Sequence, residues 1–285
     1  MRNVTYTLGC ADFLYTKSRE AEAADNVDIL FIGSSHAYRT FDPRVFDRYG
    51  ITTFNLGSSN QSPIQSEVLL RTLTDSLMPR LVVFEVHPDI MSLDGVEAAL
   101  YQVNNVKPTW HMLPMVMRTR NMKVWCTAVY AMLHNTFSKS LDKFHEKNTA
   151  DNCYAGRGYV ERKVEHFSPS PIPADTITMR KEQLSALRRC TRFLSKKGIP
   201  CVLVQVPDTK VQTSAYTNLE EFRTTMSQYG DFHFMQPASL NDSLHYYDLS
   251  HLNQDGVELY DMFIYDSLLA NILKKGHNKL KYCPL

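Results

Sequence analysis

The chain has 285 residues, of which 44% are hydrophobic and 21% are charged, and its formal net charge is +1. This is the composition of a globular protein with enough sequence for one large domain or two small ones. Because the charge is balanced and Lys and Arg do not gather into a stripe, the sequence does not indicate a nucleic-acid-binding protein.

Five short apolar runs predict buried strands. The first, third and fourth are almost continuously apolar, which is typical of strands covered by helices on both faces of a parallel sheet. In chain order the runs are VDILFIG (27–33), ITTFNLG (51–57), RLVVFEV (80–86), IPCVLVQV (199–206) and DFHFMQ (231–236).

Helical patterns lie between these strands. Ser62 and Pro63 form a helix start before the amphipathic stretch IQSEVLLRTLTDSL. Residues 175–197 carry apolar side chains at helical spacing and end at Gly198, and residues 254–274 predict a closing helix. Strands that alternate with helices predict a three-layer α/β/α fold around a five-stranded parallel sheet, with right-handed crossovers.

Residues 90–173 depart from this rhythm and predict an insertion after the third strand, within a single domain of residues 1–285. Residues 109–137 are rich in Met and aromatic residues and predict a packed helical pair. Residues 148–163 predict an exposed loop. An insertion above the strand ends often shapes a pocket.

The cysteines and histidines do not indicate a metal site, and no cofactor is expected. The sequence has no CxxC, HxH or HExxH motif and no Gly-rich phosphate loop. Cys190 and Cys201 fall in helix-like and strand-like stretches and predict buried free thiols. A disulfide stays open for the other cysteines, which are Cys10, Cys126, Cys153 and Cys283.

Membrane and export signals are not visible in the sequence. No run approaches the roughly 18 apolar residues of a membrane span, and the first residues, MRNVTYTLGCADF, lack the apolar core of a signal peptide. The chain as given is therefore expected to be soluble, and a chain trimmed of a signal or anchor would look the same.

The loops after the first three predicted strands carry polar residues that could do chemistry. Ser34, Ser35 and His36 follow the first strand, residues 55–62 follow the second, and residues 87–89 follow the third. Because the carboxyl ends of parallel strands share one edge of a sheet, these loops are expected to converge there.

Near the C-terminus, Asp248 and His251 are three residues apart and would face the same way on a helical turn. A carboxylate on one imidazole nitrogen holds the tautomer that leaves the other nitrogen free to accept a proton from a hydroxyl. Asp248 or a backbone carbonyl could play that part, and Asn253 or Asp255 could cap the next helix. A strand-end serine and an Asp–His pair are the components of an activated serine nucleophile.

These blocks resemble those of the SGNH hydrolase superfamily, also called GDSL-type esterases and lipases, over residues 27–90 and 175–275. GSS after the first strand resembles the GDS block, with Ser35 in the place of the nucleophile. DLSHLNQDG resembles the last block, with Asp248 and His251 as the other members of the triad. The resemblance implies a flavodoxin-like fold and attack of the serine on an ester carbonyl.

The oxyanion hole departs from the family pattern. NLGSSNQS resembles the second block, in which a glycine of the family donates its backbone N–H to the oxyanion. In this chain Asn60 stands at that position, and Gly57 is nearby. The backbone N–H of Ser35 is the other donor that the resemblance implies. The third block, GxND in the family, reads VHPD here. Asp89 aligns with the donating Asn but only accepts when ionised, so His87 is the alternative donor. Losing one oxyanion donor costs on the order of 10²–10³ in rate.

The motifs GSSH, NLGSS and EVHP most resemble those of envelope-associated SGNH proteins. These include relatives of the alginate O-acetyltransferases and of the D-alanine transfer protein of teichoic acid assembly. This implies an acylated carbohydrate as substrate, removal or transfer of O-acyl groups such as acetyl, and envelope protein partners. It also implies an extracytoplasmic location with a trimmed signal or anchor. Six cysteines without a disulfide pattern fit a reduced compartment about as well, and the oligomeric state stays open.

Two other hypotheses stay open. One is a catalytically weak SGNH-fold protein that binds glycan or an envelope partner in a wide groove lined by aromatic residues; the other is a flavodoxin-like scaffold without this chemistry. His36 is expected to point away from the serine beside it. Arg39 is expected in a surface ion pair, with anionic substrate binding as the alternative. A pocket wall or a core position is expected for His245, Tyr246 and Tyr247.

Overall fold

A computed structural model of the chain describes residues 4–9, 12–137, 144–164 and 167–275. Its centre is a five-stranded, wholly parallel sheet with the strand order β2-β1-β3-β6-β7. The fold class predicted from the sequence is therefore confirmed. The strands are β1 (Ile29–Ile32), β2 (Thr53–Asn55), β3 (Leu81–Glu85), β6 (Cys201–Gln205) and β7 (Asp231–Phe234).

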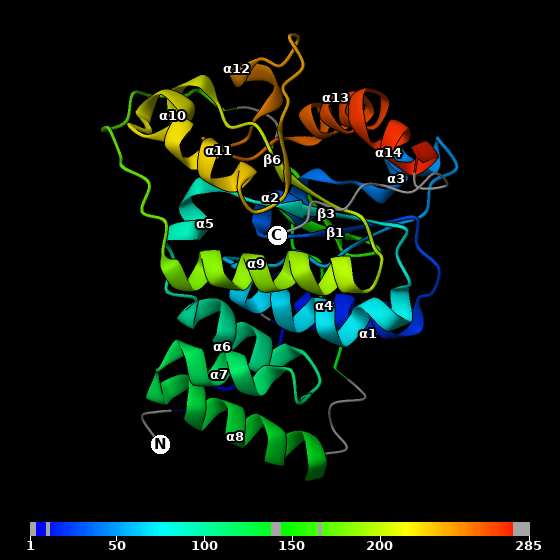
Figure 1. Ribbon diagram of the computed structural model, residues 1–285, viewed down its shortest axis with the longest axis vertical. Helices are drawn as coiled ribbons and strands as arrows, with labels where there is room; N and C mark the ends of the chain where they lie inside the picture. Colours follow the sequence, from blue (N-terminus) through cyan, green and yellow to red (C-terminus); the bar gives the residue numbers. More distant parts are fainter. Residues whose placement is uncertain (1–3, 10–11, 138–143, 165–166, 276–285) are drawn as a thin grey trace.

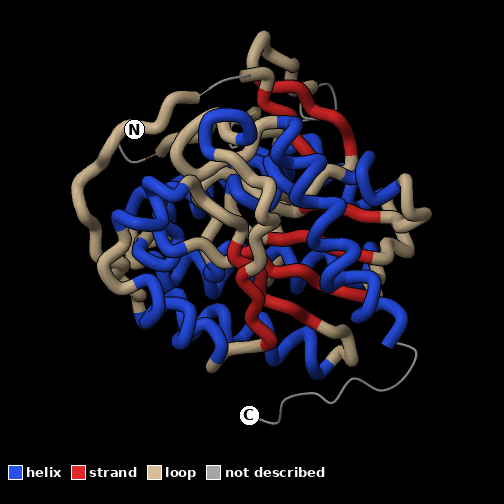
Figure 2. Tube along the Cα trace, turned by 90° about the horizontal axis from the view of Figure 1, so that it is seen from above, coloured by secondary structure: helices blue, strands red, loops and turns tan. Residues whose placement is uncertain are grey.

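The sheet separates two apolar cores, because successive side chains along a strand point to opposite faces. Leu30 and Ile32 of β1 belong to one core, and Ile29 and Phe31 belong to the other. Figure 1 shows the strands between the two groups of helices, and Figure 2, seen from above, shows helices lying across the strands. This burial on both faces explains why the strands read as nearly continuous apolar runs.

Helices cover both faces of the sheet (Figure 1). Side chains that pack on the Leu30 face come from α1 (Leu14–Ala23), α4 (Pro63–Leu77), α5 (Pro88–Ser92), α9 (Lys181–Lys196) and α11 (Leu219–Ser227). Those on the Ile29 face come from α2 (Ser35–Thr40), α3 (Pro43–Asp47), α13 (Gln254–Ile264), the π-helical turn η2 (Tyr265–Leu269) and α14 (Ala270–Lys275). Two short helices, α10 (Lys210–Ala215) and α12 (Asp242–His245), lie in the loops after β6 and β7.

The helix ends follow the predicted signals. Pro63 begins α4 after a capping box in which Ser62 and Gln65 bond reciprocally across the first turn. Asn253 caps α13 by accepting the backbone N–H of Gly256, which selects Asn253 over Asp255 as the cap. Caps of this kind stabilise a helix end by about 1 kcal/mol. The predicted closing helix is present, but η2 interrupts its α-helical pattern.

The predicted helical pair in the insertion is present, although its packing differs from the expectation. Helices α6 (Val96–Asn105), α7 (Met112–Thr119) and α8 (Met122–Phe137) form a layer outside α1, α4 and α9 (Figure 1). Their inner side chains join the core, but several large apolar side chains of α7 and α8 are exposed rather than packed.

The prediction of an exposed loop over residues 148–163 is wrong. The segment forms an antiparallel hairpin of β4 (Asn152–Gly156) and β5 (Tyr159–Arg162), and Tyr159 and Val160 are buried. The hairpin turn fits tightly against the sheet, since the carbonyl of Arg157 accepts the N–H of Asn55. Gly158 has φ +83°, and a Cβ there would lie 1.7 Å from the Asn55 carbonyl oxygen, so only glycine permits this approach.

Free thiols are found at Cys126, Cys153, Cys190 and Cys201, while Cys10 and Cys283 lie outside the described residues. Cys190 is buried as predicted, and Cys201 is half-buried. Within the described ranges, no helix combines the length and apolar character that crossing a bilayer requires.

Candidate active site

The two serines after β1 have different roles. Ser34 is fully buried; its hydroxyl accepts the backbone N–H of His36 at 3.2 Å and donates to the carboxylate of Glu85 at 2.8 Å. A Cβ on Gly33 would lie 2.4 Å from that carboxylate, so the chain needs glycine to pass it. Ser34 is therefore a structural cap, and Ser35 is the partly exposed residue at the sheet edge.

Ser35, His251 and Asp248 form one continuous hydrogen-bonded chain. His251 Nε2 lies 2.8 Å from Ser35 Oγ, and His251 Nδ1 lies 3.0 Å from both carboxylate oxygens of Asp248. With the Nδ1 proton donated to Asp248, Nε2 is left to accept from the serine hydroxyl. The structure thus brings together three residues that the sequence separates by up to 216 positions.

Asp248 is held in its charged form. Burial opposes ionisation, but the bonds and charge of His251 and the backbone N–H groups of Ser250 and His251 outweigh it and hold the pKa of Asp248 below its usual value. Asp248 rather than a backbone carbonyl is therefore the partner of His251 Nδ1, and a negative charge stands behind the imidazole.

A stack of histidine rings extends from His251 into the interior. His36 lies between His251 and His87, with ring centroids 4.4 Å and 3.7 Å away and planes within 12° and 8° of parallel. His36, expected to point away from Ser35, thus packs against the imidazole that Ser35 contacts. Because Ser35 begins α2, the next side chain turns under His251 rather than away from it.

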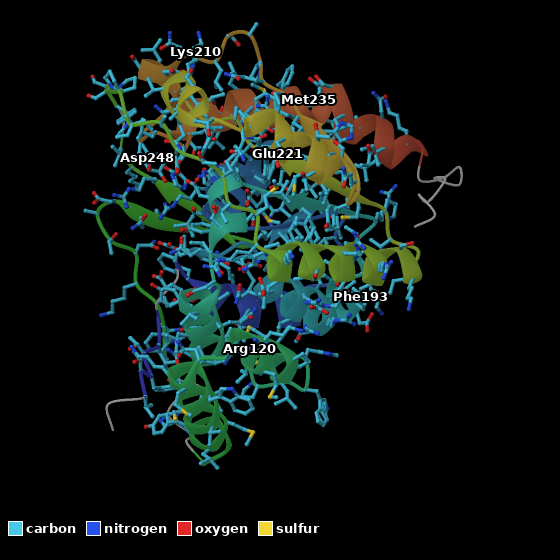
Figure 3. The ribbon with its side chains drawn as sticks, turned by 60° about the vertical axis from the view of Figure 1, so that its left-hand side comes forward. Arg120, Phe193, Lys210, Glu221, Met235 and Asp248 are labelled. Carbon is cyan, nitrogen blue, oxygen red and sulfur yellow. The ribbon has the colours of Figure 1, made fainter. Side chains whose placement is uncertain are left out.

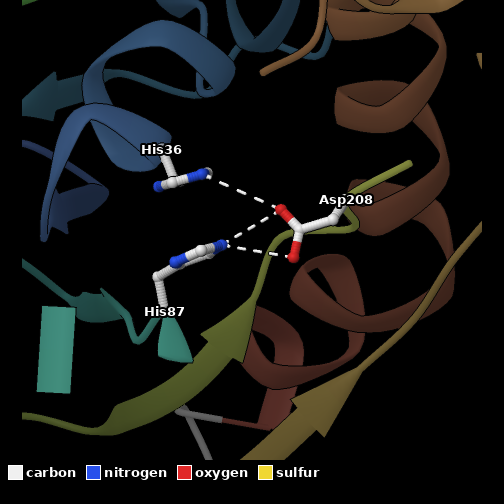
Figure 4. A group of neighbouring side chains, drawn as sticks. All are labelled: His36, His87 and Asp208. Atoms are coloured by element: carbon white, nitrogen blue, oxygen red, sulfur yellow. Dashed lines mark hydrogen bonds and ion pairs between the residues drawn. The ribbon is translucent and has the colours of Figure 1, made fainter. Parts of the chain in front are cut away.

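The stack ends on Asp208, which lies in the loop after β6 and which the sequence analysis missed. His87 Nε2 bonds Asp208 at 3.0 Å and 3.2 Å, and His36 Nε2 is 3.9 Å from the same carboxylate (Figure 4). The signal was available: QVPD places an acid at the carboxyl end of a predicted strand, at the same sheet edge as Ser35.

The two inner histidines carry different charges at neutral pH. Burial opposes protonation of His87, but the charge and hydrogen bonds of Asp208 raise its pKa to about 9. Burial, and then the charges of His87 and His251, hold the pKa of His36 well below its usual value. A neutral imidazole therefore separates the buried His87–Asp208 ion pair from His251.

A metal site needs several ligand atoms close together. Among the described residues, one group has its ligand atoms within 4.8 Å of one another, and its members are His36, His87 and Asp208. The two imidazoles are nearly parallel, however, so their nitrogen lone pairs run side by side instead of converging on one point. In addition, His87 Nε2 and the Asp208 carboxylate are bonded directly to each other, so these two atoms do not face a shared metal position. We interpret the group as an ion pair beside a neutral ring.

The candidate oxyanion donors differ in how their N–H groups are engaged. The N–H of Ser35 is in the first turn of α2, where helix geometry supplies no acceptor. Asn60 has a left-handed backbone at φ 52°, and its side chain donates to Glu97 at 3.0 Å. The Gly57 N–H is not available, since it donates to the side-chain oxygen of Asn55 at 3.0 Å.

The structure does not place His87 or Asp89 as the third oxyanion donor. Nε2 of His87 is bonded to Asp208, Nδ1 lies 3.9 Å from the carboxylate of Asp89, and the residue is 1% exposed. The Asp89 carboxylate accepts the hydroxyl of Tyr216 at 2.8 Å. The loop after β3 therefore supports the histidine stack rather than an oxyanion.

Arg39 is in an ion pair, but a buried one. It donates to Asp12 and to the side chain of Asn152, both at 3.1 Å, and is 8% exposed. Both contacts hold the guanidinium inside the protein, so the geometry does not support the alternative of an arginine free to bind an anionic substrate.

The residues before Asp248 divide between the two predicted roles. Tyr246 is a core residue, fully buried, with its hydroxyl donating to the carbonyls of Pro207 and Asp208. Tyr247 is half-buried, and its ring stacks on that of His251 with the centroids 5.5 Å apart. This position suits a pocket wall rather than the core. His245 Nδ1 accepts the N–H of Asn241 at the turn before α12.

No protein-family model matches the sequence, and no curated protein is similar to it. Among solved structures, the chain is similar to a protein of Bacteroides fragilis assigned as an acylhydrolase, at 12% identity and a TM-score of 0.40, over 90% of this chain and 95% of that one. It is also similar to a GDSL-like lipase of Bacteroides thetaiotaomicron, at 13% identity and a TM-score of 0.40, over 93% and 99%. Both TM-scores are below 0.5.

Proposed function

We propose that the chain is a serine ester hydrolase of the SGNH type, in which Ser35, His251 and Asp248 act as a catalytic triad. The observation that carries the proposal is the unbroken hydrogen-bonded chain from Ser35 Oγ through His251 to Asp248. It joins a partly exposed hydroxyl at the carboxyl edge of the sheet to an imidazole with a carboxylate behind it, which is the arrangement that activates a serine.

In the proposed reaction, Ser35 Oγ bonds to the ester carbonyl carbon while His251 Nε2 takes the hydroxyl proton. The carbonyl electrons move to oxygen and give a tetrahedral oxyanion. Its collapse breaks the bond to the leaving alcohol, which takes the proton from His251 and leaves an acyl group on Ser35. Water or a sugar hydroxyl then attacks the acyl group, passes its proton to His251, and Ser35 is released with its proton restored.

Asp248 and the backbone donors set the electrostatics of these steps. The ionised carboxylate of Asp248 stabilises the imidazolium that forms on His251. The N–H groups of Ser35 and Asn60 are the proposed oxyanion donors. Since the loop after β3 supplies no third donor, we expect turnover to be lower than with a complete oxyanion hole, by on the order of 10²-fold.

The substrate class rests on the sequence resemblance to envelope-associated O-acyltransferases. We propose an acylated, in particular O-acetylated, carbohydrate, with hydrolysis or transfer decided by whether water or a sugar hydroxyl reaches the acyl-Ser35 carbonyl. A second candidate is an SGNH-fold protein with weak turnover that binds glycan or an envelope partner. The engagement of His87 and Asp89 away from the oxyanion favours that candidate.

Labelling with a fluorophosphonate tests the proposal, because this reagent bonds covalently to an activated serine. We expect the wild type to be labelled on Ser35, and labelling to be lost in Ser35→Ala and His251→Ala. Ser243→Ala, which removes an exposed serine of α12, is the matched control and should label normally. A folded wild type that takes no label would support the binding protein instead.

Release of acetate from an O-acetylated glycan tests the substrate class separately. Labelled protein that hydrolyses small aryl esters but not the acetylated glycan would keep the triad and reject the carbohydrate. Acetate that appears on an added sugar instead of in solution would identify transfer.

A further inference from the structure

The exposed apolar side chains of the described chain are concentrated on one part of the molecule. Trp110 and Met122 are 78% and 68% exposed, whereas exposed large apolar side chains elsewhere, such as Met78 and Leu244, are scattered. Single exposed apolar residues need no explanation, but a cluster marks an interaction site. We call this cluster the α7–α8 face; its members are Trp110, Leu113, Met117, Met122, Val129 and Leu133.

Helical spacing explains why these residues are exposed together. Leu113 and Met117 are one turn apart on α7, and Met122, Val129 and Leu133 recur at intervals of seven and four on α8. The opposite sides of both helices are already buried, through side chains such as Met115, Val116, Val124 and Ala131. Packing within the protein therefore accounts for one face of each helix and leaves the other apolar face exposed.

The segment that forms this face carries only positively charged residues. Residues 98–137 contain no Asp or Glu, while they contain four basic residues, Lys107, Arg118, Arg120 and Lys123. Lys107 pairs with Glu22, and Arg118 pairs with Glu67. Arg120 and Lys123 make no ion pair with any residue in the described ranges, and both are exposed beside Met122.

A cationic cavity adjoins the same helix. It has a volume of about 280 Å³ between α4, α7 and α9, and its lining includes three arginines, Arg71, Arg118 and Arg189. All three bond the single carboxylate of Glu67, at 3.2, 3.1 and 2.8 Å, so the cavity keeps a net positive charge.

The cavity and the apolar face share α7. Pro114 and Arg118 line the cavity, and they are the positions next to Leu113 and Met117 along the helix. The two pairs therefore form adjoining stripes one turn long. Burial and the two neighbouring arginines lower the pKa of Arg118, in keeping with a site that holds more positive charge than its one carboxylate balances.

We propose that the α7–α8 face docks on an anionic lipid bilayer, with its apolar side chains in the interfacial region and the arginine-lined cavity next to the phosphate headgroups. Apolar side chains alone would suit a protein partner equally. An acid-free segment with exposed cations beside a tryptophan and methionines is complementary to a negatively charged interface, where helices lie in the membrane plane.

This docking would leave the candidate active site accessible. Figure 3 shows Arg120, at the C-terminal end of α7, and Asp248, in the proposed triad, at well-separated places in the molecule. A bilayer on the α7–α8 face would therefore hold the protein at the surface without covering Ser35. The proposal does not depend on the esterase function, because it is tested by binding to lipid vesicles alone.

Co-sedimentation of the full chain with lipid vesicles tests the proposal. We expect the wild type to pellet with vesicles of phosphatidylcholine and phosphatidylglycerol, less with phosphatidylcholine alone, and less as NaCl is raised. Leu113→Gln/Met117→Gln should lower the partition coefficient more than about tenfold, because two apolar side chains no longer enter the interface. Arg120→Gln/Lys123→Gln should lower it about fivefold per charge.

The control is Met78→Gln/Leu244→Gln, which removes apolar side chains of matched exposure, 52% and 58% against 53% and 53%, outside the α7–α8 face. It should bind like the wild type, and circular dichroism should show all variants folded. The proposal is overturned if the wild type stays in the supernatant with anionic vesicles, or if the Leu113/Met117 variant binds as well as the control. A wild-type oligomer that becomes monomeric in that variant, without vesicle binding, would identify a protein interface instead.

Discussion

The imidazole of His36 lies parallel to that of His251, with ring centroids 4.4 Å apart. His251 is the proposed general base, and its ring is held at one edge by Asp248 and on one face by His36. On the other side of His36 lies His87, which is paired with Asp208. The orientation of His251 therefore depends on residues from the ends of three strands, β1, β3 and β6.

Asp248→Asn should leave the fold intact and lower kcat by about 10³–10⁴-fold. The amide keeps the shape of the carboxylate but favours the wrong imidazole tautomer and removes the charge that stabilises the imidazolium. Steady-state hydrolysis of an aryl ester measures the change. A loss of less than tenfold would mean that Asp248 does not act on His251 during the reaction.

His36 is a positioning residue in this scheme, and its variants should separate stacking from hydrogen bonding. His36→Phe keeps a flat ring against His251 and should retain most of kcat. His36→Ala removes the ring contact and should lower kcat about tenfold with KM unchanged, in line with the 0.5–1.5 kcal/mol of an aromatic pair. Equal kcat values for the two folded variants would show that the stack does not orient His251.

The His87–Asp208 pair should make stability depend on pH. Asp208 raises the pKa of His87 in the folded protein from 6.5 to about 9 despite burial. A raised pKa contributes stability that is full below the unfolded pKa and is lost as pH rises through about 9. The difference in unfolding free energy between wild type and His87→Gln should therefore shrink by about 3 kcal/mol between about pH 6 and about pH 10.

Urea unfolding at a series of pH values measures this difference. Subtracting the variant cancels other titrating groups, including the buried Lys17, whose pKa burial lowers to about 7. Parallel stability curves for the two proteins would contradict the buried ion pair.

The hairpin of β4 and β5 offers a matched pair of glycines. Gly158→Ala would place a Cβ 1.7 Å from the Asn55 carbonyl oxygen, whereas the nearest atom to a Cβ at Gly156 is 4.0 Å away. Both have positive φ, +83° and +92°, so both variants bear a similar backbone cost. We expect Gly158→Ala to be less stable than Gly156→Ala by about 2 kcal/mol in chemical unfolding. Equal stabilities would mean that the hairpin moves away without loss.

The sequence predicted the parts of the fold that depend on local patterns. Apolar runs located the five strands, and Ser62 with Pro63 located the start of α4, because burial period and capping are properties of neighbouring residues. It also singled out Ser35, Asp248 and His251, since a strand end and a DxxH turn have fixed places in the series of strands and helices.

The sequence could not predict contacts between residues far apart in the chain. The sequence does not predict the hairpin of residues 152–162. The hairpin turn packs against Asn55 through Gly158, and Asn55 lies over a hundred residues earlier in the chain. The sequence predicts a packed α8, but its outward apolar face is exposed. Periodicity shows that a helix has an apolar face, but it does not show how many of its faces a neighbouring element covers.

The chain by itself therefore determined which residues stand at the ends of the strands, because strand ends follow from local burial and turn chemistry. Only the tertiary structure decided what each of them does there. His87 became the partner of Asp208, 121 residues away, instead of an oxyanion donor. A buried imidazole takes its charge and its role from the groups that folding brings around it, and no local pattern records them.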